Sequence, residues 1–431
     1  MESKKRIAFY TLGCKLNFSE TSQISRQFPT DKFQVVDFNA HADIYVINTC
    51  VVTEKAEKKS RAAIRQAKRR NPEAIVAAVG CYSEINPEEI LSLRATEIVL
   101  GTSEKFAIAD YLKSGDFEKR GVVSDKYSEN NFIPSYSFND RTRSFFKIQD
   151  GCDYFCAYCT VPLARGRSRS GTIADTVIMA QTIAAKGCKE IILTGVNVGD
   201  FGRKNNECLI DLLREIENNV PVERIRISSI EPDLLTKDII EFVARSKKFL
   251  PHFHIPLQSG CNKILNAMKR RYEIESFTEK VDHIKKLMPD SCIAVDIITG
   301  FPGETEEDFN ESLKYLEASP ISALHVFTYS EREKTPAALM DGAISHEERK
   351  LRSQKLLDLS LKMKEKFCNE NIGKEKSVLF ESDNDKDMMY GFTENYIKVK
   401  TPYNPELINQ VRKVLLERIE KDGIFAIKIS Q

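Results

Sequence analysis

The sequence of 431 residues lacks any apolar run as long as the roughly 18 residues that a membrane-spanning helix needs. It also lacks, after Met1, the apolar segment and cleavage site of a secretory signal, so we expect a cytoplasmic protein without membrane attachment. Net charge is nearly absent, since 64 Lys and Arg balance 63 Asp and Glu, which excludes a uniformly basic coat for nucleic acid. There is no internal repeat and no low-complexity tract. With 42% hydrophobic residues, each of about three domains has enough apolar surface for a core.

The distribution of cysteine is unusual. Eleven cysteines are an odd number, and in a cytoplasmic chain they argue against a disulfide framework and for metal or redox use. Five are scattered and are interpreted as small core residues: Cys188, Cys208, Cys261, Cys292 and Cys368. The other six form two sets: Cys14, Cys50 and Cys81, and Cys152, Cys156 and Cys159.

The N-terminal segment alternates between short apolar runs and helix-length stretches, which is typical of an open parallel α/β sheet. The apolar runs cover residues 6–12, 43–48 and 74–79. The clearest helix is predicted over residues 54–70, with Thr53 as its N-cap and Asn71-Pro72 as its stop. We expect this domain to span residues 1–125, followed by a polar linker over 124–143.

A second alternating series predicts six strand–helix units, which favour a partial parallel barrel over residues 140–370. Its strands are predicted at 145–148, 190–193, 224–228, 252–255, 293–298 and 323–328, with helices at 173–186, 209–218, 234–244 and 306–318 and a long charged helix at 347–369. The tail, residues 373–431, alternates apolar and polar residues between turns and predicts a small antiparallel β-barrel. Such barrels often bind nucleic acid, but a packing module remains an alternative.

Cys152, Cys156 and Cys159 lie within eight residues, a spacing that suits a loop around a compact metal centre. A zinc site needs four ligands, and no fourth Cys or His lies nearby in the sequence. Three thiolates on a four-iron cluster leave one iron open to a small molecule. An iron–sulfur cluster is therefore the favoured interpretation, and structural zinc the alternative.

The CxxxCxxC motif directly after the first strand of such a series resembles the radical S-adenosylmethionine (SAM) superfamily. The resemblance implies that the open iron chelates SAM and that one electron from the cluster cleaves the sulfonium to give a 5′-deoxyadenosyl radical. It also implies a set of SAM contacts from the cysteine loop and the ends of later strands: Tyr158, Gly195, Asn197, Ser229, Gln258 and Gly300. On their own, these polar and glycine residues are equally compatible with ordinary turns and caps.

Cys14, Cys50 and Cys81 each end a separate predicted parallel strand. Because the carboxyl ends of parallel strands meet at one edge, these three thiols are expected to converge. This second trio resembles the methylthiotransferase branch of the radical SAM enzymes, whose N-terminal domain carries a second [4Fe–4S] cluster and whose C-terminal barrel is the TRAM module. The resemblance covers nearly the whole chain.

Within that branch, the strings TLGCKLNFSET, NTCVVTEKAEKKSR and VPLARGRSRSG look most like the threonylcarbamoyladenosine enzymes. Basic residues of the helix predicted over 54–70 and of the string VPLARGRSRSG are candidates for contacts to tRNA phosphates or to the threonyl carboxylate of the substrate. They are Lys58, Arg61, Arg65, Arg165, Arg167 and Arg169. A solvated basic helix face and loop arginines paired with acids are the alternatives.

These patterns predict a tRNA-modifying transferase that installs a methylthio group on N6-threonylcarbamoyladenosine next to the anticodon, using two [4Fe–4S] clusters and SAM. The chemistry is then carried by the cofactors rather than by catalytic side chains. The expected partners are the tRNA anticodon loop and a low-potential reductant such as flavodoxin or ferredoxin, and we expect a monomer. The alternatives are methylthiolation of isopentenyladenosine or of a ribosomal-protein aspartate, and a non-catalytic RNA-binding protein with structural metal.

Overall fold

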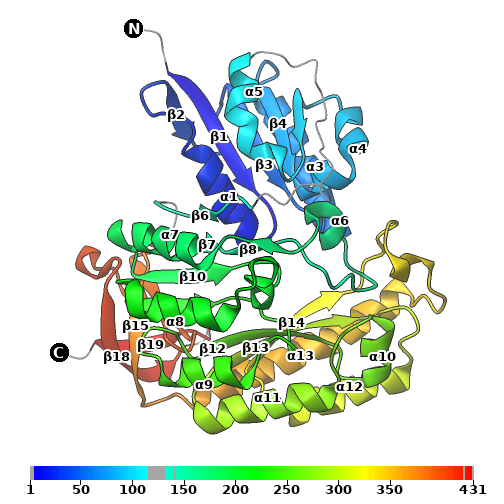
Figure 1. The fold of residues 1–431 in the computed structure, drawn as a ribbon, viewed down its shortest axis with the longest axis vertical. Coiled ribbons are helices and arrows are strands. Elements are labelled where there is room, and N and C mark those ends of the chain that lie inside the picture. The colour runs from blue at the N-terminus through cyan, green and yellow to red at the C-terminus, as the bar shows by residue number, and fades with distance from the viewer. Residues whose placement is uncertain (1–3, 115–131, 140–141, 421–422, 430–431) are drawn as a thin grey trace.

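The computed structural model describes residues 4–114, 132–139, 142–420 and 423–429. Figure 1 shows an N-terminal sheet at the top, a larger curved sheet with its helices below it, and a small β-barrel at the lower left near the C-terminus. Among the described residues, none of the helices combines the length and the apolar character that a membrane crossing requires.

The N-terminal sheet has five parallel strands in the order β2-β1-β3-β4-β5. Helix α2 packs on one face of the sheet, and α1 and α5 pack on the other, so the central strand β3 is buried along its whole length. Strands β1, β3 and β4 confirm the three predicted apolar runs. The elements are β1 Lys5–Thr11, α1 Lys15–Ser25, β2 Phe33–Val36, β3 Ile44–Thr49, α2 Glu54–Arg70, β4 Ile75–Gly80, α3 Cys81–Ile85, α4 Pro87–Ser92, β5 Ile98–Leu100 and α5 Ile108–Ser114.

Helix α2 begins and ends where its sequence predicts. The hydroxyl of Thr53 accepts a hydrogen bond from the backbone N–H of Ala56, and Asn71 ends the helix in an extended conformation before Pro72. The buried face consists largely of small and aliphatic side chains, including Ala63 and Ile64, which lets the helix approach the sheet closely. The basic side chains therefore lie on the opposite, solvent-facing side.

The middle unit is a partial barrel of six parallel strands in the order β7-β10-β11-β12-β13-β14. Isolated bridges Ile225–Phe249 and Ser229–His254 join β11 to β12, and the short β6 pairs antiparallel with β7. The strands are β6 Ser135–Tyr136, β7 Ser144–Lys147, β8 Gln149–Asp150, β9 Arg169–Ser170, β10 Glu190–Thr194, β11 Arg224–Ile227, β12 His252–Gln258, β13 Cys292–Thr299 and β14 Ala323–Thr328. The helices are α6 Val161–Arg165, α7 Ile173–Ala185, α8 Leu209–Asn219, α9 Lys237–Arg245, α10 Asn262–Ala267, α11 Ile274–Leu287, α12 Glu306–Ala318 and α13 His346–Asn369.

Two predicted segments differ from the structure. The stretch 124–143 was expected to be a linker, yet β6 lies within it and extends the barrel sheet; residues 124–131 and 140–141 lie outside the described residues. The helix expected over 234–244 begins only at Lys237, because Thr236 caps it by accepting a hydrogen bond from Ile239 N–H. The domain boundaries themselves stay predictions.

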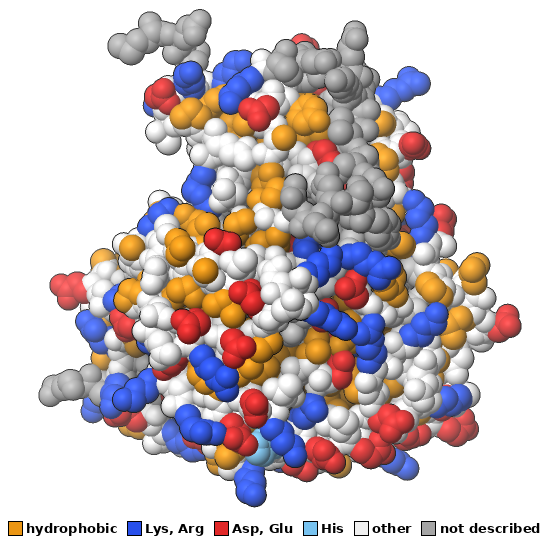
Figure 2. Space-filling view, in the orientation of Figure 1, with side chains coloured by type: hydrophobic (Ala, Val, Ile, Leu, Met, Phe, Trp, Pro, Cys, Tyr) orange, Lys and Arg blue, Asp and Glu red, His pale blue; other side chains and the backbone are white. Residues whose placement is uncertain are grey.

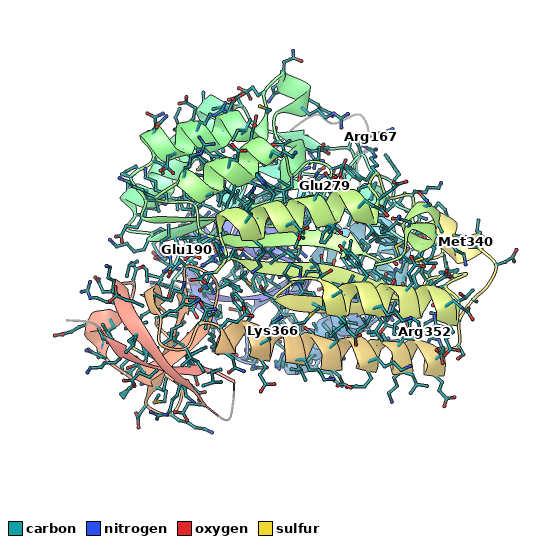
Figure 3. The ribbon with its side chains drawn as sticks, turned by 90° about the horizontal axis from the view of Figure 1, so that it is seen from below. Arg167, Glu190, Glu279, Met340, Arg352 and Lys366 are labelled. Carbon is teal, nitrogen blue, oxygen red and sulfur yellow. The ribbon has the colours of Figure 1, made fainter. Side chains whose placement is uncertain are left out.

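The C-terminal strands form a closed five-stranded barrel in the order β15-β16-β17-β19-β18. Four of its strand pairs are antiparallel, as expected, and the pair β17–β19 that closes it is parallel. The strands are β15 Glu375–Phe380, β16 Met388–Thr393, β17 Lys398–Pro402, β18 Val411–Ile419 and β19 Phe425–Ile429. Figure 3 shows α13 leading from the large barrel, near Arg352, to the small barrel, near Lys366.

Buried arginines dock the small barrel on the large one. Arg224 and Arg226 project from β11 onto the carboxylate of Glu190 on β10, with N···O distances of 2.9 Å. Their remaining N–H groups donate to backbone carbonyls of the small barrel, including that of Thr393 at 3.1 Å. Because these buried groups satisfy one another, the two barrels are held in a defined orientation.

Candidate functional site

The first cysteine trio lies at one edge of the N-terminal sheet. Cys14 precedes α1, Cys50 follows β3, and Cys81 is the first residue of α3 directly after β4. Strands β1, β3 and β4 are neighbours in the sheet, so their carboxyl ends bring the three thiols to the same side. This is the convergence that the sequence predicts.

Glycines allow the chain to turn tightly beside these cysteines. Gly13 has φ of +99°, and a Cβ built on it would lie 2.9 Å from Cys50 Sγ, which shows how closely the Cys14 loop approaches Cys50. Asn17 ties the same loops together, since its Nδ2 donates to the carbonyls of Leu12 at 2.7 Å and Thr49 at 3.1 Å. The turn after β1 is therefore held against the end of β3.

Burial makes two thiols of this trio, those of Cys50 and Cys81, poor acids in the absence of a metal. It raises the pKa of Cys50 to about 12, and the neighbouring thiol of Cys81 raises it further. Burial also raises the pKa of Cys81, against the opposing charge of Arg165. A cation is therefore required to hold these sulfur atoms as thiolates, and metal binding would release protons.

The second trio occupies the loop between β8 and α6. Backbone N–H groups point at two of its sulfur atoms: Tyr154 N–H donates to Cys152 Sγ at 3.5 Å, and Val161 N–H donates to Cys159 Sγ at 3.4 Å. Burial raises the pKa of Cys159 to about 12. The loop thus presents three buried or half-buried sulfur atoms, two of them with backbone donors, as a metal centre requires.

Arg270 and Glu231 lie directly behind the second trio, and the sequence reasoning missed both. The guanidinium of Arg270 donates to Cys156 Sγ at 2.9 Å and also forms an ion pair with Glu231. Burial raises the pKa of Glu231 to about 7, although Arg270 opposes this shift. The only signals in the sequence were the position of Glu231 just after a predicted strand and the arginine pair 270–271.

The distances between the sulfur atoms within each cysteine trio fit an iron–sulfur cluster better than a single zinc ion. Among the described residues, the groups that bring three metal-ligating atoms within 4.8 Å of one another are His254, Asp296 and His325, and Cys261, Asp308 and Glu311. The cysteine trios are more widely spaced, whereas Zn–S bonds of about 2.3 Å place the ligands of a zinc ion roughly 3.8 Å apart. An iron–sulfur cluster is larger and is held by cysteines of this kind.

The residues predicted to contact SAM come from one edge of the large barrel. Tyr158 is half-buried in the cysteine loop, Gly195 and Asn197 follow β10, Ser229 follows β11, Gln258 ends β12 and Gly300 follows β13. Since these strands are parallel, their carboxyl ends lie on the same side as the second trio. The structure therefore groups these residues, and their contacts with SAM stay a prediction.

Several buried polar atoms at this edge have no partner within the described residues. Both amide atoms of Asn197, Ser228 Oγ and Thr299 Oγ1 are buried without a hydrogen bond. A buried polar atom left unpaired costs free energy, so such a group indicates a missing polar ligand. A molecule rich in hydroxyl, amino and carboxylate groups, as SAM is, suits these positions.

A cavity of about 1010 Å³ connects the two parts of the site. Cys14 and Lys15 line it on the side of the N-terminal sheet, and Gly195 and Ser229 line it on the side of the large barrel. Aromatic side chains such as Phe145 form part of its wall. The volume is sufficient for a modified nucleoside, and the position lies between the first trio and the strand ends that follow the second.

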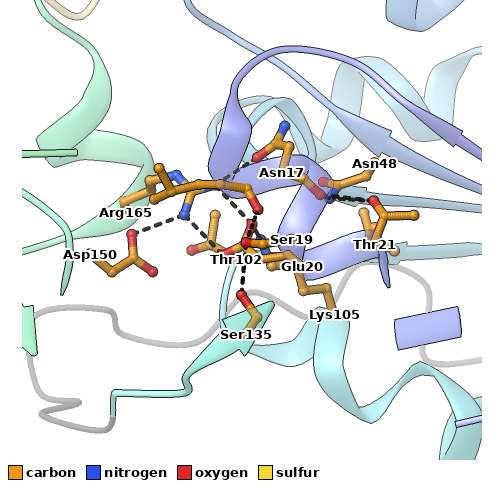
Figure 4. Close-up of polar contacts among 12 residues, drawn as sticks. Asn17, Ser19, Glu20, Thr21, Asn48, Thr102, Lys105, Ser135, Asp150 and Arg165 are labelled. Atoms are coloured by element: carbon orange, nitrogen blue, oxygen red, sulfur yellow. Dashed lines mark hydrogen bonds and ion pairs between the residues drawn. The ribbon is translucent and has the colours of Figure 1, made fainter. Parts of the chain in front are cut away.

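A buried ion network joins the N-terminal sheet to the large barrel (Figure 4). The carboxylate of Glu20 on α1 accepts from Lys105 at 2.5 Å, Lys147 at 2.9 Å and Arg165 at 3.0 Å. Burial would raise the pKa of Glu20, but the charge of Arg165, followed by those of the two lysines, holds it far below its ordinary value. This network fixes α1, and with it Cys14, relative to the second trio.

The network corrects the expectation for two of the tRNA-binding candidates. Arg165 is only 3% exposed, and its guanidinium is bound to Glu20, Asn17 and Asp150. Arg169 is largely buried, with its guanidinium donating to Asp150 and to the carbonyl of Arg165. Both were expected at an RNA surface because they stand in an arginine-rich run, but the folded chain places them against acids far away in the sequence.

Glu20→Gln should destabilise the protein strongly, because it leaves three buried cations with Asp150 as the one remaining acid in the network. Removing one partner of a buried ion pair costs about 3–5 kcal/mol. Since the pKa of Glu20 is lowered on folding, its contribution is fully present well above a pH of about 4.3 and is lost progressively as the pH falls from there toward the much lower pKa of the folded state. Urea unfolding at pH 7 and pH 4 measures both effects.

The matched control for this variant is Asp110→Asn, which removes an exposed ion pair with Lys113. Such pairs contribute little, so its urea midpoint should equal that of the wild type. Equal midpoints for Glu20→Gln and the control would show that the network is not needed to hold the two units together.

The other tRNA-binding candidates lie at or near the surface. Lys58 and Arg65 are exposed on α2, and Lys58 pairs with Glu54, whereas Arg61 is half-buried against Tyr82 and Glu89. Arg167 is half-exposed and lies over the ring of Phe155 at 4.6 Å. Figure 2 shows that basic and acidic side chains are interspersed over this face of the molecule, so any RNA contact is local.

Two family models match the chain. The model described as uncharacterized protein family UPF0004 matches residues 6–101, and the radical SAM superfamily model matches residues 146–316. The first range contains all three cysteines of the first trio, and the second range contains all three of the second.

Curated relatives match nearly the whole chain. Threonylcarbamoyladenosine tRNA methylthiotransferase MtaB of Bacillus subtilis is 37% identical over 420 residues, which cover 95% of this chain and 93% of the relative. MtaB of Aquifex aeolicus is 38% identical over 417 residues, covering 95% and 100%. The tRNA-2-methylthio-N(6)-dimethylallyladenosine synthase of Clostridium botulinum is 31% identical over 395 residues, covering 89% and 88%.

Among solved structures, the radical S-adenosylmethionine methyltransferase TsrM from Kitasatospora setae superposes with a TM-score of 0.56. The match covers 78% of this chain and 77% of that one, at 15% identity. At such low identity the likeness concerns the fold alone. Together with the superfamily match, it confirms the predicted fold class of the large barrel.

Proposed function

Because the chain belongs to the radical SAM tRNA methylthiotransferases, we propose that it converts N6-threonylcarbamoyladenosine next to the tRNA anticodon into its 2-methylthio derivative. The near full-length similarity to enzymes that carry this name supports the proposal most strongly. The dimethylallyladenosine synthases match at 31–33% identity, below the 37% and 38% of the Bacillus subtilis and Aquifex aeolicus enzymes, which favours the threonylcarbamoyl substrate.

The two cysteine trios each suit a [4Fe–4S] cluster, with Cys14, Cys50 and Cys81 on one and Cys152, Cys156 and Cys159 on the other. When loaded, the clusters and SAM supply the one-electron cleavage of SAM and the sulfur and methyl groups that are transferred. The match to the radical SAM superfamily accounts only for a cluster on Cys152, Cys156 and Cys159. A further cluster on Cys14, Cys50 and Cys81 is our proposal.

The side chains of the protein bind the cofactors, orient the substrate and shield the site from water. Arg270 places a positive charge on Cys156 Sγ, which stabilises that sulfur as a thiolate. Asn197 and the other predicted SAM contacts offer polar atoms on the same edge of the barrel. The cavity, lined by Cys14 of the first trio and by strand-end residues such as Gly195 and Ser229, is proposed to take the target adenine and to limit its contact with water.

The tRNA itself needs a wider surface than this cavity. We propose that Lys58, Arg65 and Arg167 contact its phosphates, since they are the candidates whose side chains remain exposed. The C-terminal barrel, which borders the cavity through Tyr396 and Lys398, is proposed to contact the anticodon arm as a TRAM-like module. The ring of Tyr396 stacks on Phe392 and lies against His252 in the large barrel, and 36% of the residue remains exposed.

Three further features follow from this chemistry. Cleavage of SAM needs an electron at low potential, which we expect flavodoxin or ferredoxin to deliver. All six cysteine ligands come from one chain, so a monomer is sufficient. The substrate is tRNA, which places the enzyme in the cytoplasm.

Nucleoside mass spectrometry of tRNA from a strain without the gene tests the proposed function. The 2-methylthio derivative of N6-threonylcarbamoyladenosine should fall below detection and its unmodified precursor should accumulate, and a plasmid copy should restore the product. Loss of a 2-methylthio isopentenyladenosine instead would assign the chain to the other tRNA branch, and unchanged tRNA would contradict both.

A further inference from the structure

Three lysines line the cavity: Lys364 and Lys398 belong to α13 and β17, whereas Lys15 lies beside Cys14 of the first trio. Lys15 follows Cys14 at the start of α1, is half-buried, and lines the cavity beside the first trio. Its ammonium group forms no hydrogen bond or ion pair with the described residues.

The other charged groups deep in this cavity are already paired. Arg226 is bound to Glu190 and to two carbonyls of the small barrel. His254 and His325 also line the cavity, and they share the carboxylate of Asp296, His254 Nε2 at 2.7 Å and His325 Nδ1 at 3.1 Å. The remaining lining near Lys15 is largely apolar and aromatic.

An ammonium group in such a place costs free energy unless a bound molecule brings an anion to it. No Asp or Glu is among the described residues that line the cavity, and Asp296 is already engaged with the two histidines. The anion that completes this site therefore has to come from the substrate.

We propose that Lys15 binds the threonyl carboxylate of N6-threonylcarbamoyladenosine and thereby determines which modified adenosine the enzyme accepts. This inference rests on the proposed function and names a specificity residue within it. The threonylcarbamoyl group carries a carboxylate, whereas an isopentenyl group is purely apolar. A lysine that stays unpaired when the apolar substrate binds rejects that substrate, because its charge is then buried without compensation.

The position of Lys15 fits this role. The target C2 atom has to lie beside the first trio, and Lys15 is the residue directly after one of that trio's cysteines. Two of the arginines first considered for the carboxylate, Arg165 and Arg169, are bound to Glu20 and Asp150, and Arg167 does not line the cavity. Lys15 is thus a cation available beside a cysteine of the first trio.

The test compares two anticodon stem-loop RNAs, one carrying N6-threonylcarbamoyladenosine and one in which its carboxylate is a neutral methyl ester. The holoenzyme and its Lys15→Gln and Lys15→Arg variants are titrated with each RNA by fluorescence anisotropy, and kcat/KM is measured in parallel. Wild type should bind the carboxylate RNA roughly 10-fold or more tightly than the ester, as a charged hydrogen bond implies. Lys15→Gln should bind both RNAs at the level of the ester, and Lys15→Arg should keep most of the preference.

Lys314→Gln serves as the matched control, since this lysine is exposed on the outer helix α12 and should leave both affinities unchanged. SAM cleavage without RNA should be the same in the Lys314→Gln control as in the wild type. The inference would be overturned, while the proposed function stands, if Lys15→Gln still preferred the carboxylate RNA or if it bound both RNAs more weakly by the same factor. A wild type that modifies the RNA but binds both forms alike would also overturn it. Failure of the wild type to modify the first RNA at all would instead overturn the proposed function.

Discussion

Replacing Cys152, Cys156 and Cys159 together by alanine should abolish the reductive cleavage of SAM. These three sulfur atoms are the ligands proposed for the cluster that delivers the electron, and no other described side chain is placed to substitute for them. Under strict anaerobic conditions with dithionite, the yield of 5′-deoxyadenosine should fall to the background of the reductant alone. Chromatography with mass detection of 5′-deoxyadenosine measures the effect.

The matched control is Cys208→Ala, which removes an exposed cysteine outside both trios. Its SAM cleavage should equal that of the wild type. Circular dichroism and RNA binding of the triple variant show whether the chain still folds. Continued cleavage of SAM by a folded triple variant would mean that the electron enters elsewhere.

Replacing Cys14, Cys50 and Cys81 together by alanine should separate the two halves of the reaction. Cleavage of SAM should persist, because the second trio and the strand ends of the large barrel are untouched. The methylthio product should disappear, since the proposed site that holds the sulfur to be transferred is gone. Single-turnover assays on stem-loop RNA, with both 5′-deoxyadenosine and the modified nucleoside quantified, measure the two outcomes in one reaction.

An enzyme without the first trio that still makes methylthio product would show that sulfur reaches adenine by another route. Loss of SAM cleavage in the same variant would have a different meaning. It would show that the N-terminal sheet is needed to shape the second site. The buried hydrogen bonds of Arg165 with Glu20 and Asn17 provide a physical route for such an effect. The Glu20→Gln variant perturbs the same contacts and keeps all six cysteines. Loss of SAM cleavage in this variant too would assign the effect to the buried contacts rather than to the cysteines of the first trio.

Local signals in the sequence were sufficient to predict most of the helices and strands. The helix over residues 54–70 was predictable because its cap, its buried small residues and its stop all agree. The strands β2 and β5 were missed because β2 is partly exposed and β5 is a run of three residues. The parallel pairing of β17 with β19 was also missed, because the closure of a barrel depends on the path of the whole chain.

The cysteines were predictable as sites because their spacing and their positions at strand ends carry the signal. Arg165 was misjudged, because the sequence does not show that Glu20 and Asp150 meet it in the fold. Lys15 stands in the string TLGCKLNFSET, which resembles the threonylcarbamoyladenosine enzymes, but the role proposed for it depends on a cavity that residues from three units build. Properties that depend on contacts between distant segments become visible only in the structure.

The most direct test of the account is the number of clusters. Iron and acid-labile sulfide are counted after anaerobic reconstitution of the wild type and of the two triple-alanine variants. Two four-iron clusters predict about eight irons per wild-type chain and about four in each variant. A wild type with about four irons, unchanged when Cys14, Cys50 and Cys81 are replaced, would contradict the account.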